Sequence, residues 1–245
     1  MARKRVLLTG SAGTIGRIFR QYARHRYDIV CFDCRPTKGV RKAFVANLTD
    51  LAALRRAARG CDAIVHLAAF PGPADFLETI VPNNIIGAYN AYEAAAAENV
   101  KRFVFASSIH AEFGHGEEAK VTPWMRPSPT NVYGASKILG ENLGRIFSSR
   151  HGLSVICLRF GSVLSPRYTG WMEKHDMLPT PIALLPKDLC EIIRRSIEVK
   201  GVDFAILPAF SNNARRIRDL SLLKKVLGYE PREDAYEKWG VGRIE

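Results

Sequence analysis

Short apolar runs alternate with stretches of helical periodicity along most of the chain. Such runs, bounded by polar or glycine-rich turns, predict strands that are buried on both faces. Strands are expected at residues 5–9, 28–32, 44–46, 62–69, 102–106, 153–158 and 203–207. Between them apolar side chains recur about every 3.6 residues, which predicts amphipathic helices. Helices are expected at residues 15–22, 50–59, 75–99, 130–150, from 186 onward, and 217–227.

This alternation of strand and helix requires a parallel sheet with helices on both faces. We therefore expect an α/β fold: a Rossmann-type doubly wound parallel sheet with a small interwoven C-terminal substrate-binding part. No repeat or linker divides the sequence, so residues 1–245 are expected to form a single domain. Its substrate-binding elements are expected mainly at 109–130, a long loop, and at 162–186, a proline-containing flap. Thr49 or Asp50, and Thr130 or Asn131, are expected to cap their helices.

A glycine-rich turn follows the first expected strand, with Gly10, Gly13 and Gly16 spaced by three. Glycines at this spacing allow a tight turn, close approach of the backbone to a pyrophosphate and close packing of helix on strand. Asp33 ends the second strand about 20 residues further on, where a carboxylate accepts hydrogen bonds from an adenosine ribose. An acid there repels a 2′-phosphate and favours NAD over NADP, although Arg35 could offset that repulsion.

Tyr133 and Lys137 are separated by four residues within an expected helix. Such residues share one helix face, about 5–6 Å apart at Cβ, so the lysine charge acts directly on the phenol. A nearby cation lowers the pKa of a tyrosine, about 10 when unperturbed, which makes Tyr133 a candidate general base. The alternative is a partly buried tyrosine beside a surface lysine. The glycine turn is what favours the catalytic interpretation.

The composition, with 47% hydrophobic and 24% charged residues, is that of a soluble globular protein. No apolar run reaches the ~18 residues of a membrane span, and a strand begins at once, so we expect no membrane segment and no signal peptide. Five cysteines, an odd number, favour a reducing cytoplasm. Cys31 and Cys34 have the spacing of a metal-binding pair, but a second pair is lacking and no metal is expected.

The formal net charge of +12 comes from Lys and Arg scattered along the expected helices. No nucleic-acid-binding motif accompanies them, so we expect attraction for small anionic ligands and no nucleic acid. Binding of nucleic acid through the basic surface stays an alternative. It predicts an affinity that falls steeply with salt and is indifferent to NAD.

Six motifs follow one another in a characteristic order. They are Thr9-Gly10-x-x-Gly13-x-x-Gly16, Asp33, His66-Leu67-Ala68-Ala69, Asn84-Ile85-Ile86-Gly87, Ser107-Ser108 and Tyr133-x-x-x-Lys137. Together they resemble the extended short-chain dehydrogenase/reductase family, often labelled NAD-dependent epimerase/dehydratase. Within it, the chain most resembles the uronate dehydrogenases, in residues 84–95, 104–110, 133–143 and 159–162.

The resemblance implies NAD-dependent oxidation at C1 of a cyclic sugar acid, a hexuronate such as glucuronate or galacturonate, to a lactone. Ser108 would hold the reacting hydroxyl, Tyr133 would take its proton, and Lys137 would lower the Tyr133 pKa and bind the nicotinamide ribose. The implied cofactor-binding residues are Gly10, Gly13, Thr14, Ile15, Gly16, Asp33, Asn47, Leu48, Leu67, Ala68, Ala69, Asn84, Tyr133 and Lys137. The implied substrate-binding residues are Ser108, His110, Tyr133, Ser162 and Arg167.

Two departures from the family pattern bear on these expectations. Asn47 replaces the usual acid, although its carbonyl can still bond an adenine amine, and Ile109 replaces a polar asparagine of the uronate enzymes. Arg167 is the expected grip on a substrate carboxylate, because a guanidinium binds one bidentately. The flap around it aligns poorly, so the chemistry carries over better than the substrate does.

Other readings of the same motifs remain open. A sugar-phosphate (glucose-6-phosphate) dehydrogenase would let Arg167, Lys174 and His175 meet a phosphate. A nucleotide-sugar epimerase or dehydratase shares every motif but usually has a much longer C-terminal lobe. A non-catalytic NAD sensor has no reason to keep Ser108, Tyr133 and Lys137. The family resemblance also implies a dimer through helices 75–99 and 130–150.

Overall fold

The computed structural model describes residues 3–40, 43–116, 121–122, 125–165, 169–170, 174–175, 177, 179–216 and 218–239. Within them, seven parallel strands form one sheet in the order β3-β2-β1-β4-β5-β6-β9. The strands are β1 (Arg5–Thr9), β2 (Asp28–Asp33), β3 (Ala43–Val45), β4 (Ala63–His66), β5 (Arg102–Ser108), β6 (Ser154–Phe160) and β9 (Phe204–Ala209). All seven were expected from the apolar runs, and the doubly wound fold is confirmed.

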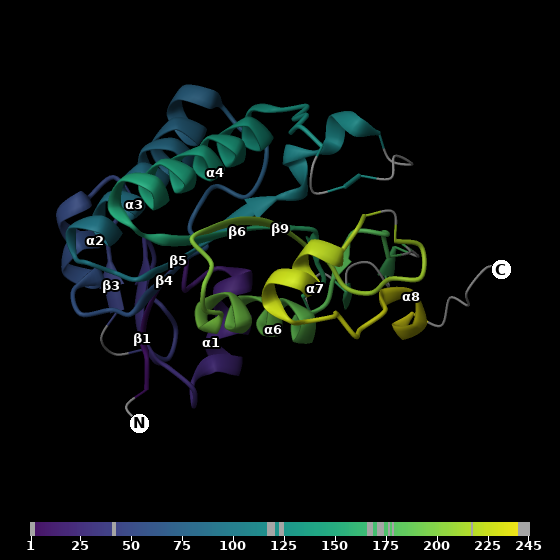
Figure 1. Ribbon diagram of the computed structural model, residues 1–245, viewed down its shortest axis with the longest axis horizontal. Helices are drawn as coiled ribbons and strands as arrows, with labels where there is room; N and C mark the ends of the chain where they lie inside the picture. Colours follow the sequence, from purple (N-terminus) through teal and green to yellow (C-terminus); the bar gives the residue numbers. More distant parts are fainter. Residues whose placement is uncertain are drawn as a thin grey trace.

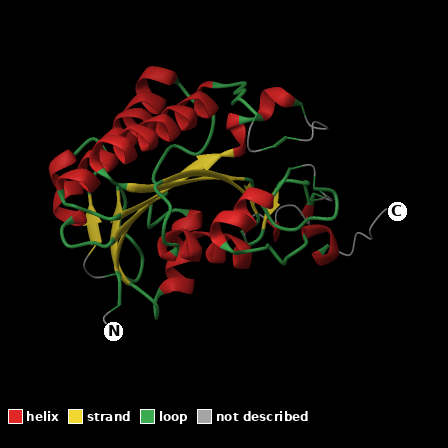
Figure 2. Cartoon of the chain, in the orientation of Figure 1, coloured by secondary structure: helices red, strands yellow, loops and turns green. Residues whose placement is uncertain are grey.

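Helices cover both faces of the sheet (Figures 1 and 2). The helices are α1 (Thr14–Ala23), α2 (Leu51–Ala58), η1 (Phe76–Ile86), α3 (Gly87–Ala97), α4 (Val132–His151), α6 (Pro186–Glu198), α7 (Ser221–Leu227) and α8 (Ala235–Lys238). In Figure 1, α2, α3 and α4 lie on one side of the sheet, and α1, α6 and α7 on the other. None of the helices described is long and apolar enough to cross a membrane.

Each face of the sheet has its own apolar core. Val6 and Leu8 pack with residues of α1, α6 and α7, whereas Leu7 between them packs with residues of α2, α3 and α4. Successive side chains of a strand point to opposite faces, so a strand buried on both faces must be apolar throughout. The continuous apolar runs of the sequence therefore follow from the two helix layers.

The expected helix at 75–99 is two helices of different geometry. Its first part, η1, is a π-helix that contains Pro82, and the amide of Gly87 donates to the Pro82 carbonyl five residues back. Proline lacks an amide hydrogen and clashes with the preceding turn, so regular α-helical bonding cannot continue through it. The closing helix is also shorter than expected and begins at Ser221.

Smaller elements were not expected from the sequence. The segment after β5 contains two 3₁₀ turns, η2 (Ile109–Ala111) and η3 (Phe113–His115). Past β6, the two-residue strands β7 (Ser162–Val163) and β8 (Ala183–Leu184) pair in parallel. Strands this short have no recognisable periodicity. All five cysteines are unpaired thiols.

Helix α4 lies unusually close to the sheet. A Cβ atom at Gly140 would lie 2.1 Å from the Phe105 ring, and one at Gly144 would lie 2.8 Å from the Tyr92 hydroxyl. Only glycine fits at so close an approach. The helix begins at Asn131, whose side chain accepts the Gly134 amide at 2.9 Å, so the expected cap is confirmed.

Candidate active site

The carboxyl ends of the parallel strands meet at one edge of the sheet, where ligands of such folds bind. The strand order reverses there between β1 and β4, whose ends pair Thr9 with His66. The glycine turn follows β1, and residues 67–69 follow β4. Two segments distant in sequence therefore face each other across this switch point.

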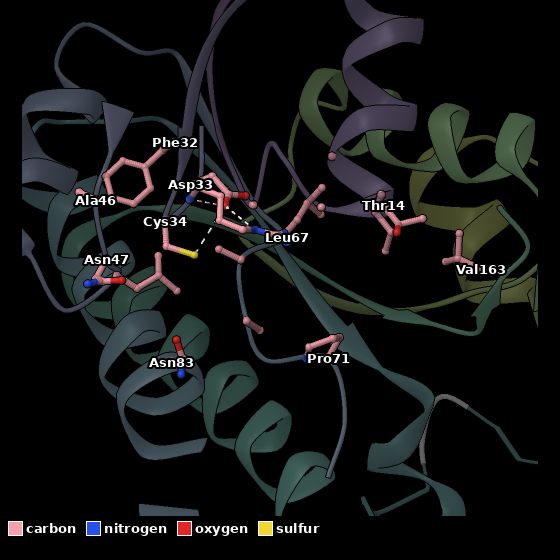
Figure 3. Close-up of a pocket in the computed structure, with 18 of the residues that line it drawn as sticks. Thr14, Phe32, Asp33, Cys34, Ala46, Asn47, Leu67, Pro71, Asn83 and Val163 are labelled. Atoms are coloured by element: carbon pink, nitrogen blue, oxygen red, sulfur yellow. Dashed lines mark hydrogen bonds and ion pairs between the residues drawn. The ribbon is translucent and has the colours of Figure 1, made fainter. Parts of the chain in front are cut away.

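A cavity of about 620 Å³ lies at the switch point (Figure 3). Eleven of the predicted cofactor-binding residues line it: Gly10, Gly13, Thr14, Ile15, Gly16, Asp33, Asn47, Leu48, Leu67, Ala68 and Ala69. The other lining residues are Phe32, Cys34, Arg35, Ala46, Pro71, Asn83, Gly161, Val163 and Ser165. Of these, only Arg35 was expected near the cofactor from the sequence. Four of them, Cys34, Ala46, Gly161 and Val163, end or directly follow a strand, a position that could have indicated them.

The glycine turn gives the cavity the features of a phosphate site. Gly10 has φ +71°, and a Cβ there would lie 2.8 Å from the Ala68 amide nitrogen. A Cβ at Gly16 would lie 2.2 Å from the Gly10 carbonyl oxygen, so helix α1 packs directly on the turn. No side chain caps α1 at Gly13, and its first turn has no acidic residue. The helix N-terminus therefore presents amide groups and a partial positive charge to the cavity.

Asp33 ties the end of β2 to this turn. One oxygen of its buried carboxylate accepts the Ala12 amide at 2.9 Å, and the other accepts the Arg35 amide at 3.0 Å. The largely exposed Arg35 guanidinium lies 3.7 Å from the same carboxylate. A carboxylate oxygen has more than one lone pair, so Asp33 keeps capacity to accept a ribose hydroxyl. These residues fit a dinucleotide.

A second group of polar side chains lies where β5 and α4 meet. The Ser108 hydroxyl accepts the His110 amide at 3.2 Å, and it also hydrogen-bonds to Tyr133. The Lys137 ammonium donates to the Ala106 carbonyl at 2.9 Å and lies 5.5 Å from the Tyr133 ring centroid. The structure therefore brings together the three residues predicted to be catalytic.

Burial dominates the charges of this group. It raises the pKa of Tyr133, and the hydrogen bond from Ser108 lowers that pKa only in part. Burial also lowers the pKa of Lys137 to about 8. The expectation that Lys137 brings the Tyr133 pKa down is wrong for the protein alone, because desolvation raises that pKa and the group that lowers it is Ser108.

The His110 ring packs against the ring of Tyr133, the candidate base. Its ring centroid lies 5.1 Å from that of Tyr133, nearly perpendicular to it, and 4.3 Å from that of Phe113. Asn131 donates to its Nδ1 at 3.0 Å while capping α4. Burial lowers the pKa of His110, which keeps the ring neutral near pH 7. The sequence predicts Asn131 as a helix cap but does not show that its side chain also orients His110.

His66 connects the two groups of residues. Its Nδ1 bonds the Thr9 hydroxyl at 2.9 Å, and burial, together with the charge of Lys137, lowers its pKa to about 3. Leu67 and Ala68, which follow it, line the cavity. Lys137 therefore lies near the glycine-lined cavity, and His66 is a neutral core residue.

Three predicted site residues stand apart from this arrangement. Asn84 is buried and its amide is engaged by both backbone groups of Phe70 and by the Ser136 hydroxyl, so it braces the cavity wall against α4 and does not line the cavity. Ser162 is not among the cavity residues either, since strand alternation turns Gly161 and Val163 toward the cavity instead. Arg167 lies outside the described residues.

A doubly wound sheet with a glycine-lined cavity at its switch point defines a dinucleotide-binding α/β protein. Residues 6–193 match the model of the NAD dependent epimerase/dehydratase family. The chain belongs to this family, and NAD is its cofactor.

Similar proteins differ in the sugar that they act on. The NAD-dependent glucose-6-phosphate dehydrogenase of Haloferax volcanii is 30% identical over 95% of this chain and 94% of that protein. The L-arabinose 1-dehydrogenase (NAD(P)(+)) of the same organism is 30% identical over 94% of this chain and 97% of that protein. A solved tyrosine-to-alanine variant of uronate dehydrogenase from Agrobacterium tumefaciens, complexed with NAD, is 28% identical, with a TM-score of 0.87 over 98% of this chain and 89% of that chain.

Burial of Lys137 predicts a characteristic pH dependence of stability. Its pKa is about 8 when folded and about 10.5 when unfolded. Between these pH values the unfolded state binds more protons, so the free energy of unfolding rises with pH. Relative to Lys137→Met, we expect wild type to gain about 3 kcal/mol from pH 8 to 10.5 in urea titrations. Lys101→Met, which changes an exposed lysine, should follow wild type. A wild-type-minus-Lys137→Met difference independent of pH would contradict the prediction.

Proposed function

We propose that this chain is an NAD-dependent dehydrogenase that oxidises C1 of a cyclic sugar acid, a hexuronate, to the aldarolactone. The observation that carries the proposal is the grouping of Ser108, Tyr133 and Lys137 beside a cavity that fits a dinucleotide. Similarity to a uronate dehydrogenase over nearly the whole chain supports it.

The roles of the three residues follow from their positions. The Ser108 and Tyr133 oxygens together hold the C1 hydroxyl, and the Tyr133 oxygen takes its proton. NAD, when bound, accepts the hydride from C1 and brings the positive charge of its nicotinamide ring. The Ser108 hydrogen bond is the contact of this chain that favours phenolate against the effect of burial.

The substrate carboxylate is the part of the proposal that depends most on the resemblance. We assign its binding to Arg167, with His110 and Ser162 contacting the sugar. The neutral His110 ring beside Tyr133 supports this role, because it can bond a hydroxyl without competing for the proton. Segments 109–130 and 162–186 would thus supply the substrate contacts within a single domain.

A sugar phosphate is the second candidate substrate. The similarity to a glucose-6-phosphate dehydrogenase over 95% of the chain favours it. The same grouping of Ser108, Tyr133 and Lys137 would serve either substrate, since the reacting C1 hydroxyl is common to both. Only the residues that meet the anionic group would differ.

A substrate panel tests the proposal. We expect NADH formation, followed by absorbance, with glucuronate or galacturonate, and a kcat/KM at least about 10-fold higher than with glucose 6-phosphate or L-arabinose, because only the uronates carry a carboxylate. Glucose 6-phosphate as the best substrate would favour the second candidate. No NADH with any of these sugars would overturn both.

The Tyr133→Phe variant tests the assignment of the base. Removing the hydroxyl should lower kcat by about 100-fold or more while NAD still binds, because only the proton transfer is lost. Tyr22→Phe is the matched control, since it removes a phenol hydroxyl that bonds Glu191 on the far side of the sheet. Equal kcat for Tyr133→Phe and wild type means that Tyr133 is not the base.

We also propose that the protein dimerises through η1, α3 and α4. Val132, Leu139 and Ile146 are exposed and spaced by seven, so they form one apolar stripe on α4. Leu77 on η1, which is 70% exposed, and Tyr89 on α3 extend the apolar surface. Burying such a surface against a second copy removes it from water.

Sedimentation measures the expected dimer. Wild type should sediment with the mass of two chains, and the double variant Leu139→Glu/Ile146→Glu with the mass of one, because buried unpaired carboxylates oppose association. Arg56→Glu, a charge change on α2, should remain dimeric. A monomeric wild type would contradict the proposed dimer and leave the proposed enzymatic function unaffected.

A further inference from the structure

Four charged side chains form a buried chain of ion pairs beside the candidate active site. The members of this charge chain are Glu141, Arg159, Glu112 and Arg218, and each is at most 5% exposed. Arg159 binds both oxygens of Glu141 at 2.7 and 2.8 Å, and its Nη1 donates to Glu112 at 2.8 Å. The Arg218 guanidinium lies 3.5 Å from the other oxygen of Glu112.

The Glu141 end of the charge chain holds the helix that carries the candidate base. Glu141 lies one helical turn beyond Lys137 on the same face of α4. It also accepts the hydroxyl of Ser107 at 2.6 Å, and Ser107 directly precedes Ser108. The Glu141 carboxylate therefore ties the end of β5 to α4.

The Glu112 end holds the segment that carries His110. Glu112 directly follows the turn η2, and its amide donates to the Ile109 carbonyl at 2.8 Å. Arg159 approaches it from β6, whereas Arg218 comes from the C-terminal part of the chain. One carboxylate thus joins three segments that are distant in sequence.

Stability alone does not explain these charges. Two carboxylates and two guanidiniums balance, but taking them out of water is costly, and apolar side chains would stabilise a buried site as well. A guanidinium that binds carboxylates in its plane does fix their relative orientation. Arg159 does this for Glu141 on α4 and for Glu112, which follows η2.

We infer that Arg159, Glu141, Glu112 and Arg218 are positioning residues that keep the Ser108–His110 segment in register with Tyr133 on α4. None of them lines the dinucleotide cavity, so they act on the chemical step and leave cofactor binding alone. The inference rests on the proposed sugar oxidation for its kinetic consequences.

Glu112→Gln is the first test, because it keeps the shape of the side chain and places an amide against a guanidinium. We expect kcat for the sugar to fall by about 10- to 100-fold, as for misplaced catalytic groups, while the Kd for NAD changes less than about 2-fold. Glu191→Gln, which breaks ion pairs with Arg194 and Arg195 on α6, is the matched control and should keep wild-type kcat. Equal losses of kcat in both variants would contradict the inference.

A double-variant cycle separates positioning from general damage. If Glu112 acts through the Ser108 segment, Glu112→Gln should lower kcat by less than about 2-fold in a Ser108→Ala background, because residues that act as a unit are not additive. A loss as large as in the wild-type background means that Glu112 acts independently of Ser108. That result would overturn the inference.

Amide hydrogen-exchange rates test the inference even if the protein oxidises no sugar. In Glu112→Gln, amides of 109–116 and 132–141 should exchange about 10-fold faster, while those of the glycine turn stay as in wild type. If this variant does not fold, Arg218→Lys, which keeps the charge balance, should show the same pattern more weakly. Unchanged exchange in both segments overturns the inference, whereas absent NADH formation with wild type overturns only the proposed function.

Discussion

The close approach of α4 to β5 is the constraint on which the candidate site depends. Gly140 leaves room for the Phe105 ring, and a side chain there would push the helix away from the sheet. At this separation Lys137 reaches the Ala106 carbonyl, and Tyr133 reaches Ser108. A glycine with no chemistry of its own thereby determines whether Tyr133 and Ser108 meet.

Burial then sets the protonation of the site. In water a lysine near a tyrosine favours phenolate, but here both groups are buried, so each is pushed toward its neutral form. Positive charge brought next to Tyr133 would lower its pKa again. In the charge chain around Arg159, by contrast, the buried side chains stay charged because each has an oppositely charged partner.

The candidate site has two parts, one formed by the strand ends and α4 and one by the segments after β5 and β6. The glycine turn, Asp33 and the Ser108–Tyr133–Lys137 grouping require only a dinucleotide and a hydroxyl, which dehydrogenases of phosphorylated, neutral and acidic sugars share. In the proposed function, the segments after β5 and β6 supply the contacts to the anionic group of the substrate, so specificity lies outside the sheet.

The amino-acid sequence by itself determined the succession of strands and helices along the chain. The apolar runs, the glycine turn, the acid at Asp33 and the Asn131 cap are local patterns whose meaning does not depend on distant residues. This prediction was incomplete where contacts with residues far along the chain decide. The sequence could not show that Pro82 lies in a π-helix packed on α4, that Asn84 braces Phe70, or that burial raises the Tyr133 pKa. Nor could it pair Arg159 with Glu112 and Glu141. Desolvation and long-range pairing exist only once the chain is folded, so only the tertiary structure could decide them.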